Sequence, residues 1–130
     1  MQDCYAGDIG DYGKFALLRE LHGQGLCIGV NWYKTDAITS EKQEDGKYCI
    51  PDHLSVYDKM LSSSLRKVYH SQEGIVRSIA ALEDEKLIDE ALYFSDRVPV
   101  EHRGEWHQHA LSELSSTDLI FLDPDNGMIV

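Results

Sequence analysis

The sequence predicts a three-layer α/β fold with a mainly parallel sheet. Three apolar, β-prone segments are separated by stretches with helical periodicity, and no two of them are joined by a hairpin signal. Strands that alternate with helices are typical of parallel sheets, because each crossover helix covers a face of the sheet. The 130 residues correspond to one domain over 1–130, long enough for a core of its own.

The composition narrows the classes of function. The formal net charge is −11, from 23 acidic and 12 basic residues, and a surface of that sign repels phosphate backbones unless a local basic patch overrides it. Either the partner is not a nucleic acid, or the acidic surface is presented to a basic protein. A solvated, solubilising surface is the commonest reason for such acidity.

Membrane insertion and disulfide chemistry are not expected. No apolar run approaches the roughly 20 residues that span a bilayer, and the N-terminal residues lack a basic, apolar signal. We therefore expect a cytoplasmic protein without a membrane partner. The three cysteines are an odd number without a CxxC pair, which argues against a disulfide framework and a zinc site.

A glycine-rich stretch, residues 7–14, leads into the first predicted helix, which ends at Gly23. Asp8 or Asp11 can cap the first turn of this helix. The backbone N–H groups at such a helix start can also hold an anion, with Lys14 as a nearby cation. Capping and anion binding remain equal alternatives here, because the spacing matches neither the Walker loop nor GxGxxG.

Residues 26–33 form the first predicted strand, apolar and rich in β-formers. Gly29 within it indicates close approach of another backbone, and Asn31 lies at its carboxyl end. Next, a helix opens at Pro51 and is expected to be interrupted by the serines at 62–64. Ser71 is expected to cap a further helix.

The second half of the chain predicts a strand over 90–95 and a helix over 103–114. Three histidines lie around the start of that helix: His102, His107 and His109. His107 and His109 are two residues apart and point to different faces of a helix, unlike the i, i+4 pairs of metal sites. The pattern therefore favours surface histidines over a metal site.

The last predicted strand, residues 119–122, is an unbroken apolar run typical of a strand buried on both faces. The polar turn Asp123, Pro124, Asp125, Asn126 and Gly127 follows it directly. Open α/β sheets bind their ligands at the carboxyl ends of their strands. The sequence therefore predicts a functional site in this turn.

Three stretches, residues 5–18, 29–33 and 121–127, resemble an uncharacterised family of bacterial and phage proteins. More distantly, the chain is similar to class I Rossmann-like methyltransferases, especially ribosomal RNA adenine methyltransferases. Those enzymes carry an Ala-Gly-Asn…Asp…Lys stretch before the first strand and Asp-Pro-Pro-aromatic after the fourth. The resemblance implies a Rossmann-like fold and S-adenosylmethionine-dependent methyl transfer to an amino group of a nucleic acid or small molecule.

The resemblance also implies roles for individual residues. The turn after the last strand would hold the substrate amine, and a second group of residues would line the pocket beside the cofactor. The implied catalytic residues are Asp123, Asp125 and Asn126, and the implied cofactor-binding residues are Asp8, Asp11, Lys14 and Asn31.

Departures from the methyltransferase pattern leave two alternatives open, an active enzyme and a degenerate form that binds without turning over. Asp125 and Asn126 replace the second proline and the aromatic residue, which removes the stacking platform for a flipped base. The segment 31–33 stands where these enzymes have a glycine loop. The chain also stops at Val130, whereas such folds add further strands, so we expect an incomplete sheet with an exposed edge at 119–122. A basic protein or a second copy of the chain would cover that edge.

Two other functions fit the sequence. A small acidic inhibitor of the phage type, which mimics a nucleic acid, would explain the charge and the short length. A magnesium-dependent phosphohydrolase or nuclease would use aspartate oxygens as the ligands of Mg²⁺. The candidate ligands are Asp8, Asp11, Asp123 and Asp125.

Overall fold

The computed structural model describes residues 1–36 and 47–124. Their fold is mixed α/β, with five α-helices, two short 3₁₀ helices and three strands. In chain order the elements are η1 Asp3–Tyr5, α1 Ile9–Gly23, β1 Ile28–Asn31, α2 Asp52–Ser55, α3 Lys59–Tyr69, η2 Gln72–Gly74, α4 Ile79–Asp84, β2 Leu92–Phe94, α5 Arg103–Glu113 and β3 Leu119–Leu122. No helix within the described ranges has both the length and the apolar character needed to cross a bilayer.

The three strands form an open parallel sheet in the order β2-β1-β3. The prediction of a parallel sheet is therefore confirmed. The prediction that residues 119–122 are buried on both faces is wrong, because β3 lies at an edge of the described sheet and Leu122 is 47% exposed. The central strand is β1, all four residues of which are buried.

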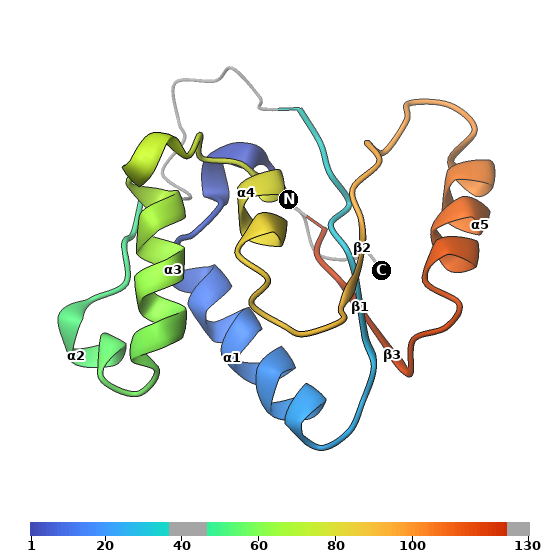
Figure 1. Ribbon diagram of the computed structural model, residues 1–130. Coiled ribbons are helices and arrows are strands. Elements are labelled where there is room, and N and C mark those ends of the chain that lie inside the picture. The colour runs from blue at the N-terminus through green and yellow to red at the C-terminus, as the bar shows by residue number, and fades with distance from the viewer. Residues whose placement is uncertain (37–46, 125–130) are drawn as a thin grey trace.

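The two faces of the sheet pack against different helices, as Figure 1 shows with α1, α3 and α4 on one side and α5 on the other. Val30 is in register with Tyr93 and Phe121, and these three side chains join the larger apolar cluster, which includes residues of α1, α3 and α4. Phe94 and Ile120 point to the opposite face and belong to the cluster of α5. This alternation follows from the two-residue repeat of a strand. Assignment of these layers to the Rossmann-like group stays a prediction.

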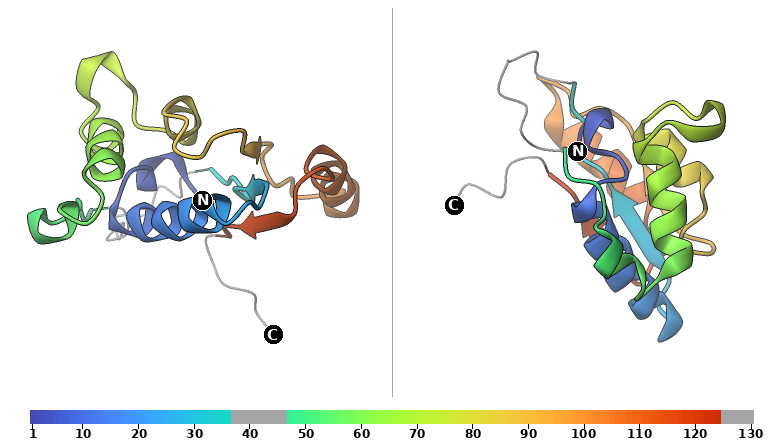
Figure 2. Two further views of the ribbon diagram at one scale, coloured as in Figure 1. Left: turned by 60° about the horizontal axis from the view of Figure 1, so that its bottom comes forward. Right: turned by 90° about the vertical axis from the view of Figure 1, so that its left-hand side faces the viewer.

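The side chains of Leu114 and Thr117, which follow α5, approach the backbone of β1 at Gly29, whereas the sequence predicts the approach of another backbone. A Cβ atom at this position would lie 2.9 Å from the Oγ1 of Thr117 and 3.4 Å from a methyl carbon of Leu114. A contact of 2.9 Å is closer than packed atoms tolerate, so any larger residue would force Thr117 to shift. Figure 2 shows α5 set apart from the other helices, at the end of the molecule that carries the sheet.

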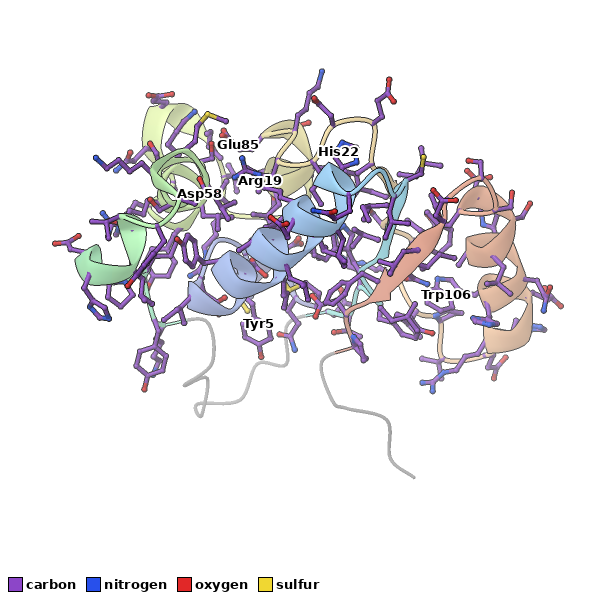
Figure 3. All side chains as sticks on the ribbon, turned by 90° about the horizontal axis from the view of Figure 1, so that it is seen from below. Tyr5, Arg19, His22, Asp58, Glu85 and Trp106 are labelled. Carbon is purple, nitrogen blue, oxygen red and sulfur yellow. The ribbon has the colours of Figure 1, made fainter. Side chains whose placement is uncertain are left out.

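Trp106 fixes the amino-terminal half of α5 against the strand ends (Figure 3). Its indole ring meets the ring of Phe94 edge-on, with 5.5 Å between the centroids, and that of Tyr33 at 5.0 Å. Edge-to-face pairs at such distances add to the area buried by the rings.

The helix α1 begins with Asp8 as its N-cap. The Oδ1 of Asp8 accepts a hydrogen bond of 3.0 Å from the backbone N–H of Asp11, and the helix ends at Gly23. The sequence allows either Asp8 or Asp11 as the cap. Asp8 is the cap, so the carboxylate of Asp11 is available for other contacts.

The predicted interruption at Ser62, Ser63 and Ser64 is wrong, because all three lie inside α3. The helical stretch breaks earlier, between α2 and Asp58, whose Oδ1 caps α3 by accepting from the N–H of Leu61 at 2.9 Å. The Ser62 hydroxyl donates to the carbonyl of the residue three positions back, so it is satisfied without opening the helix.

The predicted cap at Ser71 is also wrong. Ser71 lies in the left-handed region with φ of 51°, and its side chain makes no capping bond. The helix α4 begins after Ser78, seven positions further along, whose Oγ accepts from the N–H of Ala81 at 3.1 Å. Both positions carry a serine before an apolar stretch, and only the path of the chain distinguishes them.

Replacing Ser78 with alanine should lower the free energy of unfolding by about 1 kcal/mol, because the amino end of α4 loses its side-chain acceptor. The matched substitution Ser71→Ala should change it by less than about 0.5 kcal/mol. Urea unfolding followed by circular dichroism measures both. Equal losses in the two variants would contradict the assignment of the cap to Ser78.

Candidate functional site

The candidate site lies where the carboxyl ends of β1 and β3 meet the first turns of α1. Asn31 is in register with Leu122, so the residue after each strand reaches the same edge of the sheet. Asp123 follows β3, and its backbone N–H donates to the carbonyl oxygen of Asn31 at 3.0 Å. The parallel arrangement thus brings Asp123 beside β1, although 92 positions separate it from Asn31 (123 − 31 = 92).

Asp11 is the most buried charged residue of the site, with no exposed surface. Its Oδ2 accepts from the backbone N–H of Gly7 at 2.8 Å, and its Oδ1 accepts from the Nζ of Lys14 at 3.2 Å. Burial raises the pKa of Asp11 to about 6, while Lys14 and the Gly7 N–H act in the opposite direction. Asp11 is therefore mostly ionised at pH 7 and binds a proton at mildly acidic pH.

Lys14 bridges two carboxylates that come from distant parts of the chain. Its Nζ lies 3.2 Å from the Oδ1 of Asp11 and 2.9 Å from the Oδ2 of Asp123. Burial alone would lower the pKa of Lys14, but the two carboxylates outweigh it and hold that pKa above its ordinary value. Lys14 is therefore a fixed cation that joins α1 to the end of β3.

Asp123 is held on three sides and keeps one oxygen for a ligand. Its carbonyl oxygen accepts from the amino group of Met1 at 3.0 Å, and its Oδ2 accepts from Lys14. Within residues 1–36 and 47–124, its Oδ1 has no hydrogen-bond partner. The side chain is 12% exposed, so this oxygen is a pre-positioned acceptor.

Asp8 and Asn31 use their side chains to hold the backbone around the site. The carboxylate of Asp8 is the cap of α1, and the Oδ1 of Asn31 accepts from the N–H of Tyr33 at 3.1 Å. The structure thus brings Asp11, Lys14 and Asp123 into one cluster, with Asp8 and Asn31 supporting the turns that carry it. Asp125 and Asn126 lie outside the described residues.

The amino group of Met1 is a member of the site that the sequence does not indicate. It donates to the carbonyl oxygens of Trp32 and Asp123 at 3.0 Å each and to that of Tyr33 at 3.3 Å. These three carbonyls come from two strand ends, so no spacing along the chain could have pointed to them. Tyr33 has a φ of 46°, a conformation rare for a residue other than glycine.

The aspartates do not form a ready metal site in the described part of the chain. No group of three or more carboxylate, histidine or cysteine side chains there is close enough to hold a metal ion. Lys14, not open space, separates Asp11 from Asp123. A divalent cation would have to displace this ammonium.

The chain matches no protein-family model, no curated protein and no solved structure among those with which it was compared.

Proposed function

We propose that this protein is a methyltransferase-like protein that binds S-adenosylmethionine and directs methyl transfer to an amino group. The proposal rests on Asp123 at the carboxyl end of β3. Lys14 bonds to its Oδ2, and its Oδ1 has no hydrogen-bond partner among the described residues. An acceptor oxygen in that place can take an N–H from a substrate amine. That hydrogen bond would hold the amine nitrogen in position for a methyl group that bound S-adenosylmethionine would supply, with S-adenosylhomocysteine as the leaving group, which is catalysis by positioning.

The turn after β1 supports a place for the cofactor. Methyltransferases of the resembled class have a glycine loop there, and this chain has Asn31, Trp32 and Tyr33 instead. Tyr33 nevertheless adopts the positive φ that glycine favours, with the Asn31 side chain bonded to its N–H. The Tyr33 N–H bonds to Asn31 and the Trp32 and Tyr33 carbonyls bond to the Met1 amino group, so this turn supports the cofactor only by its fixed bend at the strand end, where open α/β sheets bind ligands.

The backbone carbonyl of Asp123 supports an amine as the ligand of this edge. It accepts from the Met1 amino group, together with the carbonyls of Trp32 and Tyr33. Three carbonyl oxygens and two carboxylates supply hydrogen-bond acceptors at this edge, while Lys14 and the Met1 amino group offset the two carboxylate charges, which favours a neutral N–H donor as the ligand. The proposed acceptor of the methyl group is therefore a neutral amino group of a nucleic acid base or a small molecule.

Thermal unfolding with S-adenosylmethionine or S-adenosylhomocysteine tests the cofactor. At about 100 times its Kd, either ligand should stabilise the protein by about 2.7 kcal/mol, which is a shift of several degrees. Mg²⁺ and Mn²⁺ alone serve as the comparison. A shift with the metals and none with the nucleosides would favour the phosphohydrolase alternative. No shift with any of the four would leave the acidic inhibitor as the remaining function.

The role of Asp123 is tested by transfer of a radiolabelled methyl group to adenosine-containing oligonucleotides. Asp123→Asn should keep the thermal shift with S-adenosylmethionine and lose transfer by about 100-fold or more, because the substrate amine is no longer held in line. Asp118→Asn is the matched control, since Asp118 flanks the other end of β3 and bonds to the N–H of Cys27 at 2.8 Å. Equal transfer by the two variants would remove Asp123 from the reaction.

A further inference from the structure

The helix α3 carries a polar stripe in which Ser62 is buried and the other members are at least partly exposed. Lys59, Ser62, Ser63, Arg66 and His70 recur at intervals of three and four residues along α3 and its C-cap, so they lie on one side of the helix. The buried apolar residues of α3 occupy the other side. The stripe is about 16 Å long at the helical rise of about 1.5 Å per residue.

A pocket of about 500 Å³ opens along this stripe. All of its lining residues are of polar or basic types and none carries a carboxylate, although acidic residues outnumber basic ones by 23 to 12 in the whole chain. The lining consists of three basic side chains and four neutral polar ones: Lys59, Arg66 and His70, with Ser55, Ser62, Ser63 and Gln72. The pocket, which we call the α3 pocket, is thus a local basic patch on an acidic protein.

The positive charge of the α3 pocket is only partly neutralised. Lys59 has no ion-pair partner in the described part of the chain. Arg66 donates through Nη2 to the carbonyl of Ile50 at 2.6 Å and to Asp52 at 2.7 Å, but the Asp52 side chain is 94% exposed and strongly solvated. Two cationic side chains therefore remain available to an anion.

Arg66 also has an unsatisfied donor. Its Nε is buried and has no hydrogen-bond partner among the described residues. A buried N–H without an acceptor is costly, and proteins satisfy nearly all such groups. This Nε is closed to solvent, so an anion in the adjoining pocket would contact the exposed part of the guanidinium, whose planar geometry matches phosphate.

We propose that the α3 pocket binds phosphate groups, carried by a small phosphate ester or by the backbone of a single-stranded nucleic acid. Guanidinium, ammonium and serine hydroxyl groups are the side chains that contact phosphate oxygens in proteins. The stripe is longer than one phosphate, so it can hold two or more. The α3 pocket shares no residue with the Asp11–Lys14–Asp123 cluster, so the proposal of phosphate binding does not depend on methyl transfer.

Nuclear magnetic resonance of the full chain locates the site. Inorganic pyrophosphate and a single-stranded oligonucleotide of about 12 nucleotides are the two probes. Both should shift the backbone amide signals of residues 59–70 if the phosphate group itself is recognised. A shift with pyrophosphate alone would identify a small ester as the source, and a shift with the oligonucleotide alone would identify the nucleic acid backbone. Unchanged signals of these residues with both probes would overturn the proposal.

A matched pair of charge substitutions separates the pocket from general electrostatics. Lys59→Gln should weaken binding of the probe about tenfold. With the oligonucleotide it should also reduce the slope of log K against log salt by about 0.7. Lys67→Gln removes the same charge from the same helix, but Lys67 pairs with Glu85 at 3.2 Å and lies outside the pocket. Its Kd should change by less than about twofold, because a charge outside the contact is screened. Equal effects of the two substitutions, or none, would overturn the proposal.

Discussion

Replacing Lys14 with methionine should lower the free energy of unfolding by about 3 kcal/mol at pH 7, because two carboxylates lose their shared cation. Asp11 has no exposed surface and the whole Asp123 residue is 9% exposed, so water cannot fully replace the ammonium group of Lys14. Lys14 itself is 28% exposed, which places the loss at the lower end of the range for buried pairs. Methionine keeps most of the length of the side chain, so packing changes little.

Arg19→Met is the matched control for Lys14→Met. Both substitutions remove one paired cation from α1, and Figure 3 shows Arg19 facing Asp58. The side chains of this ion pair are 29% and 31% exposed, so water already weakens the attraction between them. Loss of the pair should lower the free energy of unfolding by about 0.5 kcal/mol. Urea unfolding at pH 7 measures both variants. Similar losses would mean that the Lys14 cluster contributes no more than a surface ion pair.

We expect the free energy of unfolding of Asp11→Asn to rise relative to that of the unsubstituted chain as the pH increases from about 4 to about 6. The pKa of Asp11 is raised from 3.8 in the unfolded chain to about 6 in the folded protein by burial. Between these values the folded state binds one more proton than the unfolded state, so the stability of the unsubstituted chain falls as the pH rises. An asparagine side chain in the same place cannot ionise, so the variant escapes this loss.

The size of the Asp11 effect follows from the same shift. At about 1.4 kcal/mol per pKa unit, the difference between the two proteins should change by up to about 3 kcal/mol in favour of the asparagine variant. Unfolding by urea at pH 4, 5, 6 and 7, at constant ionic strength, measures this difference. A difference that stays constant over the range, or that moves in favour of Asp11, would contradict a buried carboxyl group with a raised pKa.

Apolar runs and helical periodicity predicted where several elements lie, although not how deeply each is buried. The strand at 119–122 and the helix from 103 have their predicted positions, and the parallel pairing follows from strands that alternate with helices. Gly29 also marked a position of close approach, although side chains and not a backbone come near it. Each of these features depends on a few neighbouring residues, either on their spacing or on the missing side chain of a glycine.

Helix starts were less predictable, because several residues compete for one function. Ser71 and Ser78 are both acceptable caps, and only the latter meets an N–H group of a helix. Asp58 caps α3 in the same way, and the serines at 62–64 lie inside that helix without interrupting it. The free energy that separates such alternatives is about 1 kcal/mol, which packing of the core easily exceeds.

For the site, the sequence by itself determined which residues carry charge and where the chain turns, and it placed polar groups after β3. Only the tertiary structure decided that Asp8 caps a helix, that Asp11 is buried, and that Lys14 reaches Asp123. The parallel sheet brings the ends of β1 and β3 together across 92 positions of the chain (123 − 31 = 92). Charges that far apart in sequence interact only once the core has folded, since burial and distance set their strength.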